Sequence, residues 1–159
     1  MVQKLYLTNR LSIVIWRRAS RKEHGTMNTD SVPSKAVKIA IQHVEAFSNH
    51  DYETARSLLA DDVHFLLITS IPGFPNPAEG NGVEEFMKAL TSGNTLVPGS
   101  LQVIHSIGDD HQALITVSVK GTLPTQEPIT LLAARHYMID EHEKITNELV
   151  IMSNYEGEV

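Results

Sequence analysis

The chain has 159 residues, of which 42% are hydrophobic and 20% are charged. This length supports one domain with a hydrophobic core and is too short for two ordinary domains. The sequence contains no cysteine, which excludes disulfide bonds and thiolate metal sites.

The net charge of −6 is unevenly distributed along the chain. Residues 1–26 carry six basic side chains and one acidic side chain, for +5, whereas residues 27–159 carry −11. An acidic domain repels nucleic-acid phosphates. We therefore expect no nucleic-acid partner.

The basic N-terminal segment contains an apolar run, Leu11 to Trp16, that is far shorter than the roughly 20 residues of a membrane helix. We therefore expect no membrane partner. An Arg-rich, acid-poor segment suits an organellar transit peptide, and the alternatives are a disordered tail or sequence upstream of a start at Met27. We expect residues 1–31 to be an extension and 32–159 to be the domain, in a cytoplasmic protein or, as the alternative, an organellar one.

Apolar residues at helical spacing predict an amphipathic helix over 35–49, with Ser34 as its N-cap. A second helix is predicted over 52–60, capped by Asp51, and a strand over 63–68 follows it directly. Proline and glycine predict a loop over 70–82. The remaining segments are predicted as a helix, 83–91, and four strands, 101–107, 112–121, 129–139 and 145–152, with a turn at 140–144 between the last two.

This order segregates helices from a mostly antiparallel sheet, which predicts an α+β fold. We expect three N-terminal helices packed on a curved sheet. A curved sheet with helices across its concave face leaves a cavity between them, which is a usual place for a ligand site.

Three segments resemble the superfamily of nuclear transport factor 2, ketosteroid isomerase, scytalone dehydratase and the SnoaL-type polyketide cyclases. They are the helix pair 41–52 closing with Ala60-Asp61-Asp62, the segment 82–86 that begins with a glycine before the third helix, and 135–145 leading into the last strand. The resemblance covers about residues 35–153 and implies a cone-shaped, cystatin-like domain. Many unrelated activities share this fold, so the resemblance alone does not identify a reaction.

The isomerase branch of this superfamily uses a tyrosine and two aspartates. Alignment on 60–62 and on the last hairpin places those three positions at His43, Leu67 and Arg135. None of the three isomerase residues is present. We therefore do not expect steroid isomerisation by that mechanism.

The same alignment implies which side chains face the cavity. Most are aliphatic or aromatic, which is typical of a pocket for a small apolar molecule and equally typical of a plain core. The residues predicted to bind a ligand are Phe47, Phe65, Leu67, Ile115, Val117, Val119, Tyr137, Val150 and Met152.

Polar residues among these apolar positions are the candidate catalytic groups. Arg135 lies in an almost wholly apolar segment, and across the last hairpin we expect it opposite Glu148 or within one residue of it. The guanidinium could polarise a ligand carbonyl or stabilise an enolate. His43 is the candidate acid–base group. The alternatives are an ion pair on the outer face of the sheet and a histidine of purely structural role.

We therefore predict a domain that binds a small, mostly apolar carbonyl compound and catalyses its isomerisation, cyclisation or dehydration by acid–base chemistry. His43, Arg135 and Glu148 would be its catalytic residues. We expect no metal, since no histidine pair has helical metal-site spacing, and no cofactor. The alternative is a non-catalytic binding or dimerisation module, and we expect a homodimer through the sheet face that carries Leu66 and Ile68.

Overall fold

The computed structural model describes residues 32–74, 76–92, 95–123 and 125–155, which belong to one compact unit. The predicted extension, 1–31, lies outside the described residues. In chain order the elements are α1 (Lys35–Ser48), α2 (Tyr52–Ser57), β1 (Leu59–Thr69), β2 (Ala78–Asn81), α3 (Val83–Thr91), β3 (Gln102–Gly108), β4 (Gln112–Thr122), β5 (Pro128–Ile139) and β6 (Ile145–Asn154).

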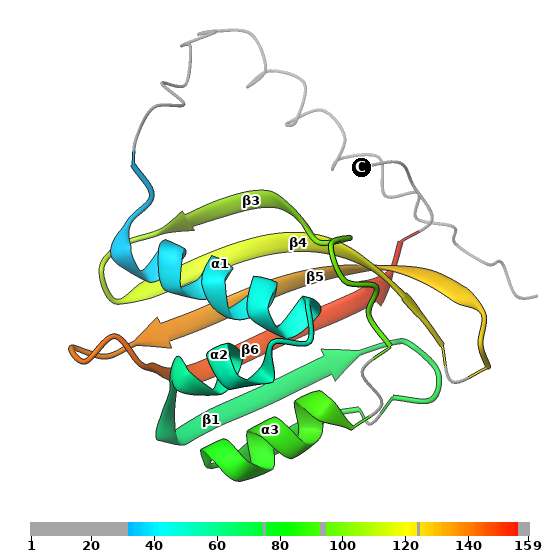
Figure 1. Ribbon diagram of the computed structural model, residues 1–159, viewed down its shortest axis with the longest axis horizontal. Helices are drawn as coiled ribbons and strands as arrows, with labels where there is room; N and C mark the ends of the chain where they lie inside the picture. The colour runs from blue at the N-terminus through cyan, green and yellow to red at the C-terminus, as the bar shows by residue number, and fades with distance from the viewer. Residues whose placement is uncertain (1–31, 75, 93–94, 124, 156–159) are drawn as a thin grey trace, which may run out of the picture. The chain divides into compact units, whose positions relative to one another are not determined.

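The six strands form one mixed sheet in the order β2-β1-β6-β5-β4-β3. The pair β1–β6 is parallel and the other four pairs are antiparallel. Figure 1 shows α1 and α2 lying across one face of this sheet, with α3 beside β1. We call the helix-covered face the inner face. The prediction of an α+β fold with a mostly antiparallel sheet is confirmed.

The helices α1 and α2 precede the first strand and α3 follows β1 and β2, which is the helix, helix, strand, helix order that the sequence predicted. Two details of the predicted elements were wrong. The strand β2 lies in the segment predicted as a loop. The strand β1 begins at Leu59, four residues earlier than predicted, because Leu59 pairs with Ile145 and the Leu58 carbonyl accepts a hydrogen bond from the Ile145 amide.

Two glycines set the edge of the sheet where α3 begins. Gly80 lies opposite Phe65, and a Cβ atom at position 80 would stand 2.6 Å from the Phe65 ring. Gly82 has φ +90°, a backbone conformation that favours glycine, and its amide donates to the Val63 carbonyl. The two glycines thus allow β2 to pair with β1 and the chain to turn directly into α3.

The core lies between the helices and the inner face. Apolar residues at helical spacing bury one side of α1, as the sequence predicted. The main cluster joins α1 and α3 to the strands and includes Val44, Phe65, Phe86, Ile115, Tyr137 and Val150. A second cluster at the other end of the sheet contains Ile71, Val119, Ile129 and Leu131.

Candidate functional site

A buried ion pair joins two neighbouring strands on the inner face. Nη1 of Arg135, on β5, lies 2.8 Å from Oε1 of Glu148, on β6, and the two side chains are only 9% and 1% exposed. Burial removes both charges from water, which is costly unless their hydrogen bonds are satisfied. The alternative of an ion pair on the outer face is therefore wrong.

The register of the pair differs from the prediction. Val150 lies opposite Arg135, two residues beyond Glu148, and Tyr137 lies opposite Glu148. The cause is an irregularity in β6: Ile139 pairs with Ile145, but Met138 pairs with Asn147, which leaves one extra residue in β6. The two charges therefore meet diagonally across the strands, at the spacing that long side chains can bridge.

Tyr137 completes this cluster. Arg135 Nη1 also donates to the Tyr137 hydroxyl oxygen, at 3.2 Å. Burial, followed by the charge of Glu148, raises the pKa of Tyr137 above its usual range, so the hydroxyl stays protonated. Burial by itself lowers the pKa of the Arg135 guanidinium. The nearby oxygens of Tyr137 and Glu148 together have the larger effect, and they raise this pKa. Arg135 is therefore a permanent cation.

Helix α1 covers the cluster with two rings one helical turn apart. The Arg135 guanidinium carbon lies 5.8 Å from the centre of the Phe47 ring, a cation–π contact. His43 meets Tyr137 edge-on, with 5.8 Å between ring centres, and lies 6.0 Å from the Phe86 ring. Residues four apart on α1 therefore contact residues two apart on β5: His43 contacts Tyr137, and Phe47 contacts Arg135.

His43 is fully buried. Burial lowers its pKa to about 4, with Glu148 raising it and Arg135 lowering it further, so the imidazole is neutral at neutral pH. Among the described residues, neither ring nitrogen has a hydrogen-bond partner, and the same is true of Arg135 Nε. Three buried polar atoms of this site therefore have unused hydrogen-bonding capacity, and the structure brings the three predicted catalytic residues together.

Most of the residues predicted to bind a ligand surround this cluster. Ile115 and Val150 flank Arg135 on the two neighbouring strands, and Phe65 lies opposite Glu148 on β1. Two of them lie outside the main apolar cluster: Val119 belongs to the second cluster, and Phe47 belongs to a third one although its ring contacts Arg135. The full set that packs in or against the main cluster is Phe65, Leu67, Ile115, Val117, Tyr137, Val150 and Met152. Their role in binding stays a prediction.

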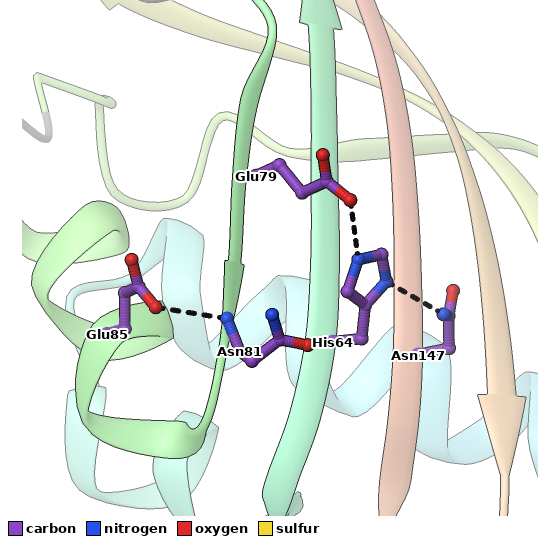
Figure 2. Close-up of polar contacts among 5 residues, drawn as sticks. All are labelled: His64, Glu79, Asn81, Glu85 and Asn147. Carbon is purple, nitrogen blue, oxygen red and sulfur yellow. Dashed lines mark hydrogen bonds and ion pairs between the residues drawn. The ribbon is translucent and has the colours of Figure 1, made fainter.

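Sequence reasoning missed the polar function of Tyr137, which it placed among the apolar lining residues. The signal was available, because residues at i and i+2 share a face of a strand. It also missed a second polar cluster, shown in Figure 2, in which His64 Nε2 lies 2.9 Å from Glu79 Oε1 and His64 Nδ1 lies 3.1 Å from Asn147 Nδ2. These side chains are partially exposed, unlike the buried Arg135 and Glu148.

Other features of the described residues lie apart from the Arg135 site. An open surface hollow of about 610 Å³ is lined by Ile107, Gly108, Asp109, Gln112, Ala113, Leu114 and His136. In the described part of the chain, no three His, Asp or Glu side chains are placed to bind a metal ion. None of the described helices has the length and apolar character that crossing a bilayer requires.

Comparison with known families decides the assignment of the domain. The sequence pattern of the SnoaL-like domain matches residues 40–148, which is more than half of the chain. This chain belongs to the SnoaL-like domain family. The match includes His43, Arg135 and Glu148. No curated protein matches the chain in sequence.

Solved structures show the same fold for this SnoaL-like domain. An NTF2-like protein from Burkholderia xenovorans has a TM-score of 0.58 at 10% identity, covering 74% of this chain and 88% of that one. An epoxide hydrolase of the LEH-like type from Mycobacterium tuberculosis has a TM-score of 0.57 at 14% identity, covering 74% and 82%. A further protein from Mycobacterium tuberculosis, in complex with estradiol-17β-hemisuccinate, has a TM-score of 0.57 at 16% identity, covering 78% and 95%. At these identities the likeness establishes the NTF2-like fold alone.

Proposed function

We propose that this SnoaL-like domain binds a small, mostly apolar carbonyl compound on the inner face of its sheet and catalyses proton transfer on it without a cofactor. One observation carries the proposal. A buried Arg135–Glu148 pair lies among apolar side chains, and Arg135 Nε beside it has no partner among the described residues. A buried donor without a partner is destabilising, and a ligand oxygen would satisfy it.

The chemistry follows from the charges of the three residues. A base removes a proton from the carbon next to the carbonyl, the C–H electron pair moves towards the carbonyl oxygen, and Arg135 stabilises the resulting enolate. Neutral His43 can accept the proton, and burial disfavours the imidazolium that forms, so His43 gives the proton back readily. Glu148 fixes the guanidinium and offsets its charge. Return of the proton to another carbon would complete an isomerisation.

Two structural relatives support this class of ligand. One is named as an epoxide hydrolase and the other contains a steroid ester. An epoxide and a steroid ester each carry oxygen on a carbon skeleton. The apolar lining around Arg135 suits a molecule of the same character.

Binding is tested with a pair of ring compounds that differ only at the carbonyl oxygen, cyclohexanone and methylenecyclohexane. We expect NMR titration to show tighter binding of the ketone, and Arg135→Met to abolish the difference. Arg56→Met is the matched control, since Arg56 is exposed and paired with Glu84. Because Arg135→Met leaves Glu148 unpaired, the double variant Arg135→Met/Glu148→Met is measured beside it. Equal binding of the two compounds by the parent protein would overturn the proposal.

Catalysis is tested separately, by exchange of the hydrogens next to the carbonyl of cyclohexanone in D2O, followed by mass spectrometry. We expect the parent protein to accelerate exchange and His43→Phe to reduce it at least about tenfold, since general-base catalysis contributes about 10²–10⁴ in rate. Binding of the ketone without accelerated exchange would instead support a non-catalytic binding module.

We further propose that the domain forms a homodimer through the outer face of the sheet. Four large apolar side chains on this face are 41–52% exposed: Ile68, Leu114, Met138 and Ile151. Ile68 and Ile151 are direct partners on β1 and β6. Exposed apolar patches of this kind are typical of interaction surfaces. Sedimentation analysis should give a dimer for the parent and a monomer for Ile151→Lys, and a monomeric parent would contradict the proposal.

A further inference from the structure

We propose that the outer face of the sheet is complementary to itself, so that Ile68 and Ile151 of one copy dock at the surface hollow beside Leu114 of a second copy. This inference rests on the homodimer proposed above and names the surfaces that meet in it. Three features of the face carry it: the position of the hollow, the different heights of its two sides, and its lack of charge.

The hollow opens on the outer face. Arg135 and Ile115 are buried on the inner face, so their chain neighbours point outward. One row of outward side chains crosses the sheet from β3 to β1: Ile107, Leu114, His136, Leu149 and Leu66. Its first three members line the hollow.

The two sides of this face differ in height. The neighbouring row of outward side chains consists of His105, Thr116, Ala134, Ile151 and Ile68. On β1 and β6 it ends in two isoleucines that pair directly and are 41% and 52% exposed. Towards β5 and β4 it continues through the smaller Ala134 and Thr116, and the hollow lies beside them. One side of the face is therefore raised and the other is recessed.

A two-fold axis can bring the raised side onto the recessed side. In the sheet, β5 has β6 and β1 on one side and β4 and β3 on the other, as Figure 1 shows. If two copies pack face to face about an axis that runs over β5, then β6 and β1 of each copy lie over β4 and β3 of the other. Ile151 then meets Leu114 of the second copy, and Ile68 meets the hollow. The same contact forms twice, and the arrangement closes at two copies.

The charge of the chain favours a second copy as the occupant of this face. Residues 27–159 carry −11, so two copies repel each other wherever their acidic side chains approach. The two rows contain no Asp, Glu, Lys or Arg, so contact through them brings no carboxylates together. A basic partner, which the acidic domain attracts elsewhere, finds no carboxylate to bind on these rows.

The test introduces opposite charges at the two positions that should meet. Ile151→Lys alone and Leu114→Glu alone should each be monomeric, because each would bury an unpaired charge twice in its own homodimer. A mixture of the two should form a heterodimer, in which one contact joins the introduced lysine to the introduced glutamate and the other keeps isoleucine on leucine. We expect the Kd of the mixture, measured by sedimentation of fluorescently labelled Ile151→Lys, to lie at least about tenfold below the Kd of either variant alone.

Met138→Glu is the matched control for Leu114→Glu. It places the same charge on the same face, at a side chain that is 49% exposed, close to the 44% of Leu114. Met138 lies on β5, outside the proposed contact with Ile151. Labelled Ile151→Lys should therefore stay monomeric when it is mixed with Met138→Glu.

A second readout uses disulfide trapping, which is straightforward because the chain contains no cysteine. A disulfide forms only where two Cα atoms lie within about 7 Å of each other. Under mild oxidation, Ile151→Cys mixed with Leu114→Cys should give a cross-linked dimer. Neither variant alone should do so, because each introduced thiol faces the other position in the second copy.

The outcomes separate this docking arrangement from the homodimer itself. A monomeric parent protein would overturn both and would leave the face to a partner of another kind. With a dimeric parent, the docking alone would be overturned if Leu114→Glu fails to restore association of Ile151→Lys, if Met138→Glu restores it equally well, or if Ile151→Cys cross-links to itself.

Discussion

Arg135 and Glu148 form their 2.8 Å ion pair although they are not opposite each other in the sheet. The extra residue in β6 places Val150 opposite Arg135 and Tyr137 opposite Glu148. The guanidinium reaches diagonally past the Tyr137 hydroxyl and bonds to it on the way. The diagonal arrangement explains how one nitrogen of Arg135 serves two acceptors while Nε is left without a partner among the described residues.

This geometry predicts strong energetic coupling between the two charges. Arg135→Met or Glu148→Met alone should lower the free energy of unfolding by about 3–5 kcal/mol, because each leaves one buried charge unpaired. The double variant should recover most of the loss. Urea unfolding of the four proteins measures the coupling. Arg56→Met serves as the control and should change little, since its pair with Glu84 is exposed. Additive losses in the double variant would contradict the prediction.

The buried imidazole predicts a loss of stability in mild acid. The pKa of His43 is about 4 in the folded protein and 6.5 when exposed, so between these values the unfolded chain binds the extra proton. Stability from this group is therefore complete above about pH 6.5 and is lost as the pH falls towards 4. Between pH 7 and pH 5 the loss is about 2 kcal/mol.

Urea unfolding at pH 7 and pH 5 checks this value. His43→Leu should remove most of the difference between the two pH values. His142→Leu, which changes a largely exposed histidine, should leave the difference intact. An equal pH dependence in the parent and in His43→Leu would show that other groups cause it.

The sequence predicted those parts of the fold that depend on periodicity. The apolar spacing in α1 and the long apolar segment around Arg135 both correspond to buried faces. It failed where tertiary contacts override the local signal. The strand β2 lies in a segment rich in proline and glycine, which predicted a loop. Leu58 and Leu59 continue the helical spacing of α2, but Leu59 pairs with Ile145 in the sheet.

The sequence predicted which residues the candidate site contains, but it did not predict the register in which β5 pairs with β6. Arg135 lies in an apolar strand, and Glu148 lies across a short hairpin from it. Because side chains alternate along a strand, the sequence predicted that both face the same side of the sheet. The extra residue in β6 carries no sequence signal, so the diagonal pairing with Tyr137 between the charges could not be derived. The missing partners of His43 depend on the packing of Phe86 and Tyr137, which lie far away in the sequence.

The close approach of Gly80 to Phe65 predicts that a methyl group is not tolerated there. A Cβ at position 80 would lie 2.6 Å from both the Phe65 ring and the Glu85 carboxyl carbon. Gly80→Ala should therefore lower the free energy of unfolding by about 1–3 kcal/mol through overpacking. Phe65→Leu removes the ring edge and should suppress part of the loss when combined with Gly80→Ala. Thermal unfolding of the two single variants and the double variant tests this, and an unaffected Gly80→Ala would show that β2 moves freely.

The polar cluster in Figure 2 predicts one tautomer of His64. The Glu79 carboxylate can only accept, so the hydrogen must lie on Nε2, and the Asn147 Nδ2 group can only donate, so Nδ1 must be bare. A ¹H–¹⁵N correlation spectrum recorded above the pH at which histidines become neutral should therefore show a protonated Nε2 and an accepting Nδ1. In Glu79→Gln this preference should weaken, because an amide can donate as well as accept. The largely exposed His142 provides the reference for a mixture of tautomers. A doubly protonated His64 ring would contradict the assignment, since it requires the Asn147 oxygen, rather than its nitrogen, to face Nδ1.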